Sequence, residues 1–269
     1  MGSVYSFLRN HALTHLPEPM LRPLKAWHYR RVLRSFSDAE EPDLIVVRQL
    51  VQPASVALDL GANIGVYTKV LSELVGQDGK VISVEPIPQT FALLSRNVRS
   101  LGLANVTCIN VAVSDANGEA LMELPDYAAG GTNFYQARVI DRVDERSIVG
   151  KRRLRVATTT LDTLARGHGK VGFVKCDVEG YELACLMGAG RILGSHFPSW
   201  LVEVSGNPDD RSASAWKTFQ VFEAHLYAPW WFDRQRLRAR NRGDQSTNYF
   251  FLRPEHVSRL RENAPGLLE

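Results

Sequence analysis

A short apolar run that ends in a glycine-containing loop and leads into a helical pattern limits the possible folds more than any other feature. The run Val56–Leu60 has the length and composition of a buried strand, and apolar residues at helical spacing follow over residues 64–75. In the loop between them, Gly61 permits a tight turn and Gly65 permits close approach of the helix to the sheet. This order predicts the first βα unit of a parallel sheet.

The same alternation continues along the chain. Further strand patterns occupy residues 81–84, 106–111, 172–176 and 200–204, and helical patterns occupy 88–101 and 182–193. Residues 226–232 and 249–252 are expected to pair as antiparallel strands at the sheet edge. The length of 269 residues suits one large domain with a short extension. We therefore predict a Rossmann-like α/β fold, with a mostly parallel sheet, helices on both faces and an antiparallel closing hairpin.

Two segments depart from this rhythm. Residues 1–40 mix apolar, aromatic and basic groups, which predicts a basic helical extension before a main domain at 41–269. This extension is expected to pack on the domain; the alternative is docking to an anionic membrane surface or an acidic partner. Residues 114–160 carry turn signals and alternating stretches, which predicts a β-rich insertion or lid. Within it, residues 127–135 are expected to face the substrate.

Composition excludes several classes of function. A net charge of +3 is too small to indicate a nucleic-acid partner. No apolar run approaches the roughly 20 residues that a membrane span needs. The three cysteines are scattered and lack metal-ligand spacing, so buried free thiols and a cytoplasmic location are expected.

The loop at 59–65 favours a cationic cofactor. Asp59 would repel a pyrophosphate and attract an ammonium or sulfonium, and Asn63 replaces the middle glycine of the dinucleotide fingerprint. The alternative, an NAD(P)-binding oxidoreductase, is therefore disfavoured. Glu85, at the end of the next strand pattern, can accept two hydrogen bonds from a ribose diol, although a lone glutamate there is more often solvated. Residues 112–115 could line an adenine pocket, with Ser114 and Asp115 as the polar candidates, although the sequence from Ser114 onward is also typical of a turn.

Two carboxylates follow the strand pattern at 172–176. Asp177 and Glu179 lie where open α/β sheets bind ligands. Alternatively, Asp177 caps the next helix, with Glu182 in the first turn. Asp177, Glu179 and Glu203 end neighbouring strand patterns and also offer oxygen atoms suited to Mg²⁺, but such carboxylates occur without metal, and the interpretation that we favour needs none.

Several blocks in a fixed order resemble a known family. They are DLGANIGVYT (59–68), VEP (84–86), TTLDTL (159–164), VKCDVEGYE (174–182) and LVEV (201–204). Together, over roughly residues 43–204, they resemble the FkbM family of methyltransferases, although Cys176 stands where that family often has isoleucine or another apolar residue. The resemblance implies a class I methyltransferase fold and S-adenosylmethionine as the cofactor. It also implies methyl transfer to a hydroxyl, often of a sugar or a polyketide-type natural product.

Site roles follow from the matching positions. The resemblance implies that five residues bind the cofactor and two line the methyl-transfer site: Asp59, Gly61, Asn63, Gly65 and Glu85, then Asp177 and Glu179. A hydroxyl acceptor must lose its proton, and Asp177 is our first candidate base, with Glu179 second. The expected partner is a small-molecule or glycan acceptor; a non-catalytic cofactor- or partner-binding module remains the alternative. Five arginines at alternate positions in 234–242 would share one face of a strand and suit an anionic acceptor, or form a solvated loop.

Overall fold

The fold is an α/β structure built on one large sheet. The computed structural model describes residues 31, 33, 36–124, 138–140 and 152–269. The basic extension expected over residues 1–40 lies mostly outside the described residues, and the acceptor-facing segment 127–135 lies wholly outside them. Among the helices of the described part, none combines the length and apolar character needed to cross a bilayer.

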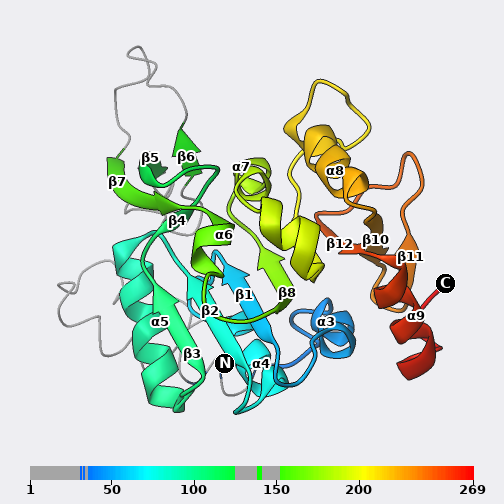
Figure 1. The fold of residues 1–269 in the computed structure, drawn as a ribbon, viewed down its shortest axis with the longest axis horizontal. Coiled ribbons are helices and arrows are strands. Elements are labelled where there is room, and N and C mark those ends of the chain that lie inside the picture. The colour runs from blue at the N-terminus through cyan, green and yellow to red at the C-terminus, as the bar shows by residue number, and fades with distance from the viewer. Residues whose placement is uncertain (1–30, 32, 34–35, 125–137, 141–151) are drawn as a thin grey trace, which may run out of the picture.

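The main sheet has eight strands in the order β11-β10-β12-β9-β8-β1-β2-β3 (Figure 1). Its strands are β1 (Val56–Leu60), β2 (Lys80–Val84), β3 (Val106–Ile109), β8 (Val171–Cys176), β9 (Ser199–Glu203), β10 (Ala228–Phe232), β11 (Leu237–Ala239) and β12 (Asn248–Leu252). The five strands from β3 to β9 are parallel, and β12 lies antiparallel between β9 and β10. The predicted parallel sheet with antiparallel closing strands is confirmed.

Helices cover both faces because successive side chains of each buried strand point to opposite sides. Leu58 and Leu60 pack with one apolar core under α6, α7 and α8, whereas Ala57 packs with the other under α3, α4 and α9. The helices are α3 (Leu44–Leu50), α4 (Val66–Val75), α5 (Pro88–Leu101), α6 (Leu161–Leu164), α7 (Glu182–Met187), α8 (Ser214–Ala224) and α9 (Pro254–Asn263).

The helical pattern predicted at 182–193 is interrupted in the structure. Helix α7 ends at Met187, and a π-helical turn follows at Ile192–His196. Gly188 lies between them, and a Cβ atom added there would stand 2.2 Å from the carbonyl oxygen of Ser114. The chain therefore bends where it passes close to the backbone that follows β4.

A second sheet lies mostly within the segment predicted to be β-rich, 114–160, and its strand β4 immediately precedes that segment. Its four strands run in the order β4-β7-β5-β6, and Figure 1 shows them beyond the arrowhead ends of β1 and β8. They are β4 (Ala112–Val113), β5 (Gly118–Leu124), β6 (Arg138–Ile140) and β7 (Arg152–Thr159). This placement brings β5 to the edge of the main sheet where its parallel strands end.

The arginines at 234–242 form neither a single face nor a fully solvated loop. Arg238 pairs with Asp233 and Glu269, each at 2.6 Å, and Arg240 pairs with Asp209 at 2.9 Å. Because β11 is only three residues long, strand alternation does not extend over the whole run. Arg238 and Arg240 therefore join the closing strands to neighbouring segments, which corrects both sequence-based alternatives.

Candidate active site

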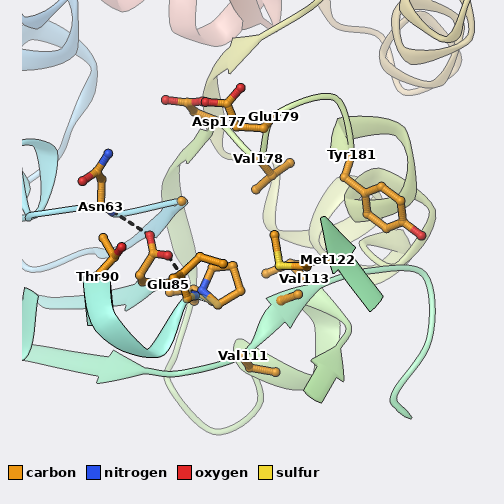
Figure 2. Close-up of a pocket in the computed structure, with 15 residues that line it drawn as sticks. Asn63, Glu85, Thr90, Val111, Val113, Met122, Asp177, Val178, Glu179 and Tyr181 are labelled. Atoms are coloured by element: carbon orange, nitrogen blue, oxygen red, sulfur yellow. Dashed lines mark hydrogen bonds between the residues drawn. The ribbon is translucent and has the colours of Figure 1, made fainter. Parts of the chain in front are cut away.

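A cavity opens at the carboxyl ends of the parallel strands. It encloses about 660 Å³, including the part open to solvent, which is within the usual range of small-molecule sites. Its lining comes from both sheets: Gly61, Asn63, Val84, Glu85, Pro86, Ile87, Thr90, Val111, Ala112, Val113, Met122, Asp177, Val178, Glu179 and Tyr181. Figure 2 shows the side chains of Asp177 and Glu179 at one end and the apolar side chains around Val113 and Met122 toward the other.

Gly61 sets how closely β1 and β8 approach at the cavity. Leu60 pairs with Cys176 in the parallel ladder, and the N–H of Asp177 donates to the carbonyl of Leu60 at 3.1 Å. Gly61 has φ +73°, and a Cβ atom added there would lie 1.8 Å from the carbonyl oxygen of Asp177. Only glycine fits this position without displacing the backbone that carries Asp177.

Glu85 follows β2 and is held by the loop that it faces. Its Oε2 accepts the N–H of Asn63 and its Oε1 accepts the N–H of Ile87, each at 3.0 Å (Figure 2). Its side chain is buried, and this burial raises the pKa of Glu85 to about 7, against the opposing effect of the two N–H donors. Each carboxylate oxygen keeps a second lone pair, so Glu85 can still accept hydrogen bonds from a ligand.

The apolar part of the cavity was identified only in part from the sequence, which placed Ala112 and Val113 in it. Ile87 follows Glu85 on the chain, Val111 and Val113 follow β3, and Met122 comes from β5. These side chains form walls suited to a flat aromatic ring system. The exit of a strand predicts the positions of Val111 and Val113, but no local signal places Met122 here, because it arrives from the second sheet.

Lys175 holds Asp177 and was also not singled out as a functional residue. Its Nζ lies 2.9 Å from Oδ2 of Asp177 and 5.1 Å from the ring centre of Tyr67. The Lys175 side chain is 8% exposed and that of Asp177 is 31% exposed. Burial favours the neutral form of Asp177, but the ammonium of Lys175 outweighs it and lowers the pKa of Asp177. Asp177 is therefore kept ionised at the wall of the cavity.

Glu179 occupies an unusual backbone conformation beside Asp177. Its φ is +54°, in the left-handed region that costs a non-glycine residue of order 1–2 kcal/mol. The residue is exposed and lines the cavity. Partial loss of water around its carboxyl group, followed by the charge of Asp177, raises the pKa of Glu179. Such local strain is typical of functional loops.

Asp59 lies beneath the cavity rather than in its lining. Its side chain is fully buried, and its Oδ2 accepts the hydroxyl of Thr68 at 2.6 Å. Thr68 in turn contacts Ser83 at 2.8 Å. Asp59 thus joins β1 to α4, and its charge acts on the buried Lys175. Its role in binding the cofactor stays a prediction.

Three other candidate residues also lie outside the lining. Gly65 has φ +97° and immediately precedes α4, where an added Cβ would be 3.0 Å from a methyl group of Leu94. Ser114 is buried, and its hydroxyl donates to the exposed Asp115 at 3.0 Å. Their neighbour Val113 lines the cavity instead. The ligand-binding roles of Gly65, Ser114 and Asp115 stay predictions.

The structure decides against helix capping by Asp177. The residue before α7 is Tyr181, which makes no side-chain cap, and Oε1 of Glu182 accepts the N–H of Gly180 at 2.9 Å. Over the described residues, no three His, Cys, Asp or Glu side chains converge as a metal ion would require.

The comparison with protein families decides the assignment. The methyltransferase FkbM domain matches residues 59–233, from the start of the glycine loop to the end of β10. The chain belongs to the FkbM methyltransferase family. The resemblance noted in the sequence blocks is confirmed over most of the described domain.

Individual proteins resemble this chain either over a short segment or at low sequence identity. Protein-L-isoaspartate O-methyltransferase 1 of Archaeoglobus fulgidus is 40% identical over 52 residues, which cover 19% of this chain and 24% of the relative. The match thus spans about a quarter of that relative. Methyltransferase FkbM from Methylobacillus flagellatus KT has a TM-score of 0.48 and 14% identity, over 87% of this chain and 60% of its own. Aeropyrum pernix fibrillarin, solved with bound S-adenosyl-L-methionine, has a TM-score of 0.44 and 13% identity, over 75% of this chain and 67% of its own.

S-adenosylmethionine is the methyl donor of the FkbM family, and the cavity residues fit this cofactor. The carboxylate of Glu85 retains lone pairs for a ribose diol, and the apolar walls suit an adenine ring. Oδ1 of Asn63 is buried without a hydrogen-bond partner in the protein. A buried polar atom in a cavity lining favours a bound polar ligand.

Proposed function

We propose that this FkbM-family protein methylates a hydroxyl group of a sugar or a natural-product-like small molecule. The single observation that carries this proposal is the distribution of carboxylates in one cavity. Glu85 stands beside the apolar walls, and Asp177 and Glu179 stand at the other end. A nucleoside cofactor held at the first group would present its reactive end to the second.

The charge of the cavity also supports a cationic cofactor over a dinucleotide. The N–H of Asn63, which in a dinucleotide-binding loop would face phosphate, donates instead to the carboxylate of Glu85. A pyrophosphate here would lie next to a carboxylate, which is unfavourable, whereas a sulfonium and an ammonium are attracted to Asp177 and Glu179. The NAD(P)-dependent alternative gains no support from this arrangement.

The protein contributes mainly position and proton transfer. Bound S-adenosylmethionine supplies an electrophilic methyl group. Holding the acceptor in line with it accounts for about 7–11 kcal/mol of the barrier in well-oriented reactions. Asp177, kept ionised by Lys175, can accept a hydrogen bond from the acceptor hydroxyl and so orient it.

Calorimetry and a methyl-release assay test the proposal. The protein is expected to bind S-adenosylhomocysteine and not NAD⁺, and then to methylate members of a panel of sugars and hydroxylated natural products. Glutamate, aspartate and isoaspartate peptides in the same panel test carboxyl methylation. Binding of NAD⁺ without binding of S-adenosylhomocysteine would remove the proposal, and methylation of only the carboxyl substrates would remove its acceptor class.

Affinity for S-adenosylhomocysteine is expected to fall at acidic pH because of Glu85. A ribose diol donates to the ionised carboxylate, so ligand binding requires the deprotonated form. With a pKa of about 7, Glu85 is ionised above that pH and must release a proton on binding below it. The dissociation constant is expected to be about tenfold higher at pH 6 than at pH 8 by linkage. Calorimetry of the wild type and Glu85→Gln measures this difference.

The Glu85→Gln variant is expected to bind more weakly at pH 8 and to lose most of the pH dependence. Glu223→Gln, on the exposed side of α8, is the matched control and should behave as wild type. A tenfold pH effect that persists in Glu85→Gln would exclude Glu85 as its source.

A further inference from the structure

Glu203 ends β9, beside the wall of the cavity. Cys176 pairs with Val202 in the parallel ladder between β8 and β9, so Asp177 and Glu203 occupy successive positions at neighbouring strand ends. The two carboxyl groups lie close enough to interact, and a protonated Glu203 can donate a hydrogen bond to Asp177. Asp177 accepts from Lys175 at 2.9 Å and, when Glu203 is protonated, can also accept from Glu203.

The charges around Glu203 are mostly negative. Asp177 and Glu179 face it from the end of β8, and Lys175 is the cation that opposes them. On its other side, Asn248 of β12 is its register partner and donates to Asp43 at 2.7 Å. Burial, followed by the charge and hydrogen bond of Asp177, raises the pKa of Glu203 to about 8.

A further acidic group reaches the same region from the segment before α3. Glu41 interacts with the hydroxyl of Tyr67, whose ring lies against Lys175. Burial, followed by the charge of Asp43, raises the pKa of Glu41, and Arg234 is the cation near Asp43. These groups act on Lys175 and Asn248 rather than on Glu203 directly. Asp177 is therefore the neighbour that couples Glu203 to the cavity.

We propose that Glu203 is a positioning residue that controls whether Asp177 can accept the proton of the methyl acceptor. This inference rests on the proposed function. In the reaction, the acceptor oxygen takes the methyl group, the electron pair of the broken carbon–sulfur bond stays on sulfur, and Asp177 takes the acceptor's proton. When Glu203 is protonated, its O–H donates a hydrogen bond to the carboxylate of Asp177 and competes with the acceptor hydroxyl. When Glu203 is ionised, its negative charge raises the proton affinity of Asp177 and the hydrogen bond is lost.

The pH dependence follows from this arrangement. The active form needs Glu203 ionised, so turnover is expected to rise as the pH increases through about 8 and to be lost below it. Glu203→Gln permanently presents an amide N–H to Asp177 and imitates the protonated state. This variant is expected to lose the pH-dependent rise and to turn over about 10²-fold more slowly at pH 9.

Infrared difference spectra during a pH titration test the interaction of Glu203 with Asp177 without any methyl acceptor present. The wild type is expected to lose the carbonyl band of one protonated carboxyl near pH 8, and Glu203→Gln should lack this step. The band of Glu85, which titrates near pH 7, is common to both proteins and cancels in their difference. Glu223→Gln is again the matched control. A step near pH 8 that survives in Glu203→Gln, or is absent from the wild type, would overturn the inference.

A second variant keeps the test decisive if Glu203→Gln does not fold. In Asp177→Asn the negative neighbour of Glu203 is gone, so the titration step is expected at lower pH; an unchanged step would contradict the pairing. Calorimetry with S-adenosylhomocysteine separates the two proposals. Wild type that fails to bind it refutes the proposed function, whereas normal binding with a flat pH–rate profile refutes the role of Glu203 alone.

Discussion

Replacement of Gly61 by alanine is expected to abolish binding of S-adenosylhomocysteine and to destabilise the domain. The new Cβ would stand 1.8 Å from the carbonyl oxygen of Asp177, and both backbones are fixed by the sheet. The N–H of Gly61 also donates to the carbonyl of Val84 at 3.0 Å, so the loop cannot shift without losing that bond. The left-handed backbone costs about 1–2 kcal/mol and overpacking about 1–3 kcal/mol more. Urea unfolding and calorimetry measure the two effects.

Gly102 provides a control that separates backbone strain from the clash. Its φ is +69°, close to that of Gly61, and nothing lies within 4 Å of the position that a Cβ would occupy. Gly102→Ala is therefore expected to lose only about 1–2 kcal/mol and to keep its affinity for S-adenosylhomocysteine. Equal losses of stability in the two variants, with binding retained in both, would show that the approach of β1 to β8 is not critical.

The ends of the central strands could be predicted from the sequence because each is a short apolar run with a polar exit. Val56–Leu60 has the predicted bounds, and β8 ends at Cys176 as expected. Since ligands bind beyond the carboxyl ends of such strands, the positions of Gly61, Glu85 and Asp177 at one cavity followed from the fold class.

The facing direction of buried polar side chains could not be predicted in the same way. A strand covered on both faces shows no alternation of polar and apolar residues. Asp59 shares the face of Ala57, toward α4, and its register partners Ser83 and Lys175 are also polar. The sequence therefore predicted that Asp59 lies at the end of the first strand, but it did not predict that the side chain points below the cavity.

Contacts between segments far apart in the sequence could not be predicted either. Met122 reaches the cavity from β5, and Glu203 reaches Asp177 through the register of β8 with β9. Lys175 sits inside an otherwise apolar strand, where a lysine alone indicates only that a charge is buried with a partner. Tertiary pairing decides which partner it has.

Asparagine in place of Asp177 is expected to reduce turnover by about 10²–10⁴-fold, a larger factor than its reduction of affinity for S-adenosylhomocysteine. The amide keeps the size of the side chain but does not accept a proton from the acceptor hydroxyl. It also leaves the ammonium of Lys175 without its ion-pair partner at 2.9 Å. Loss of a charged partner typically costs about 1–3 kcal/mol, so the free energy of unfolding should fall as well.

Three measurements distinguish a loss of chemistry from a loss of folding. Single-turnover methyl transfer reports the chemical step, calorimetry reports cofactor affinity, and urea unfolding shows what fraction of Asp177→Asn is folded under assay conditions. Asp78→Asn, an exposed aspartate after α4, controls for the substitution itself and should match wild type in all three. If folded Asp177→Asn transfers methyl groups at the wild-type rate, proton acceptance must occur elsewhere, and Glu179 becomes the remaining carboxylate of the cavity end that can perform it. If turnover and affinity instead fall by the same factor, Asp177 acts in binding the cofactor and not in the transfer step.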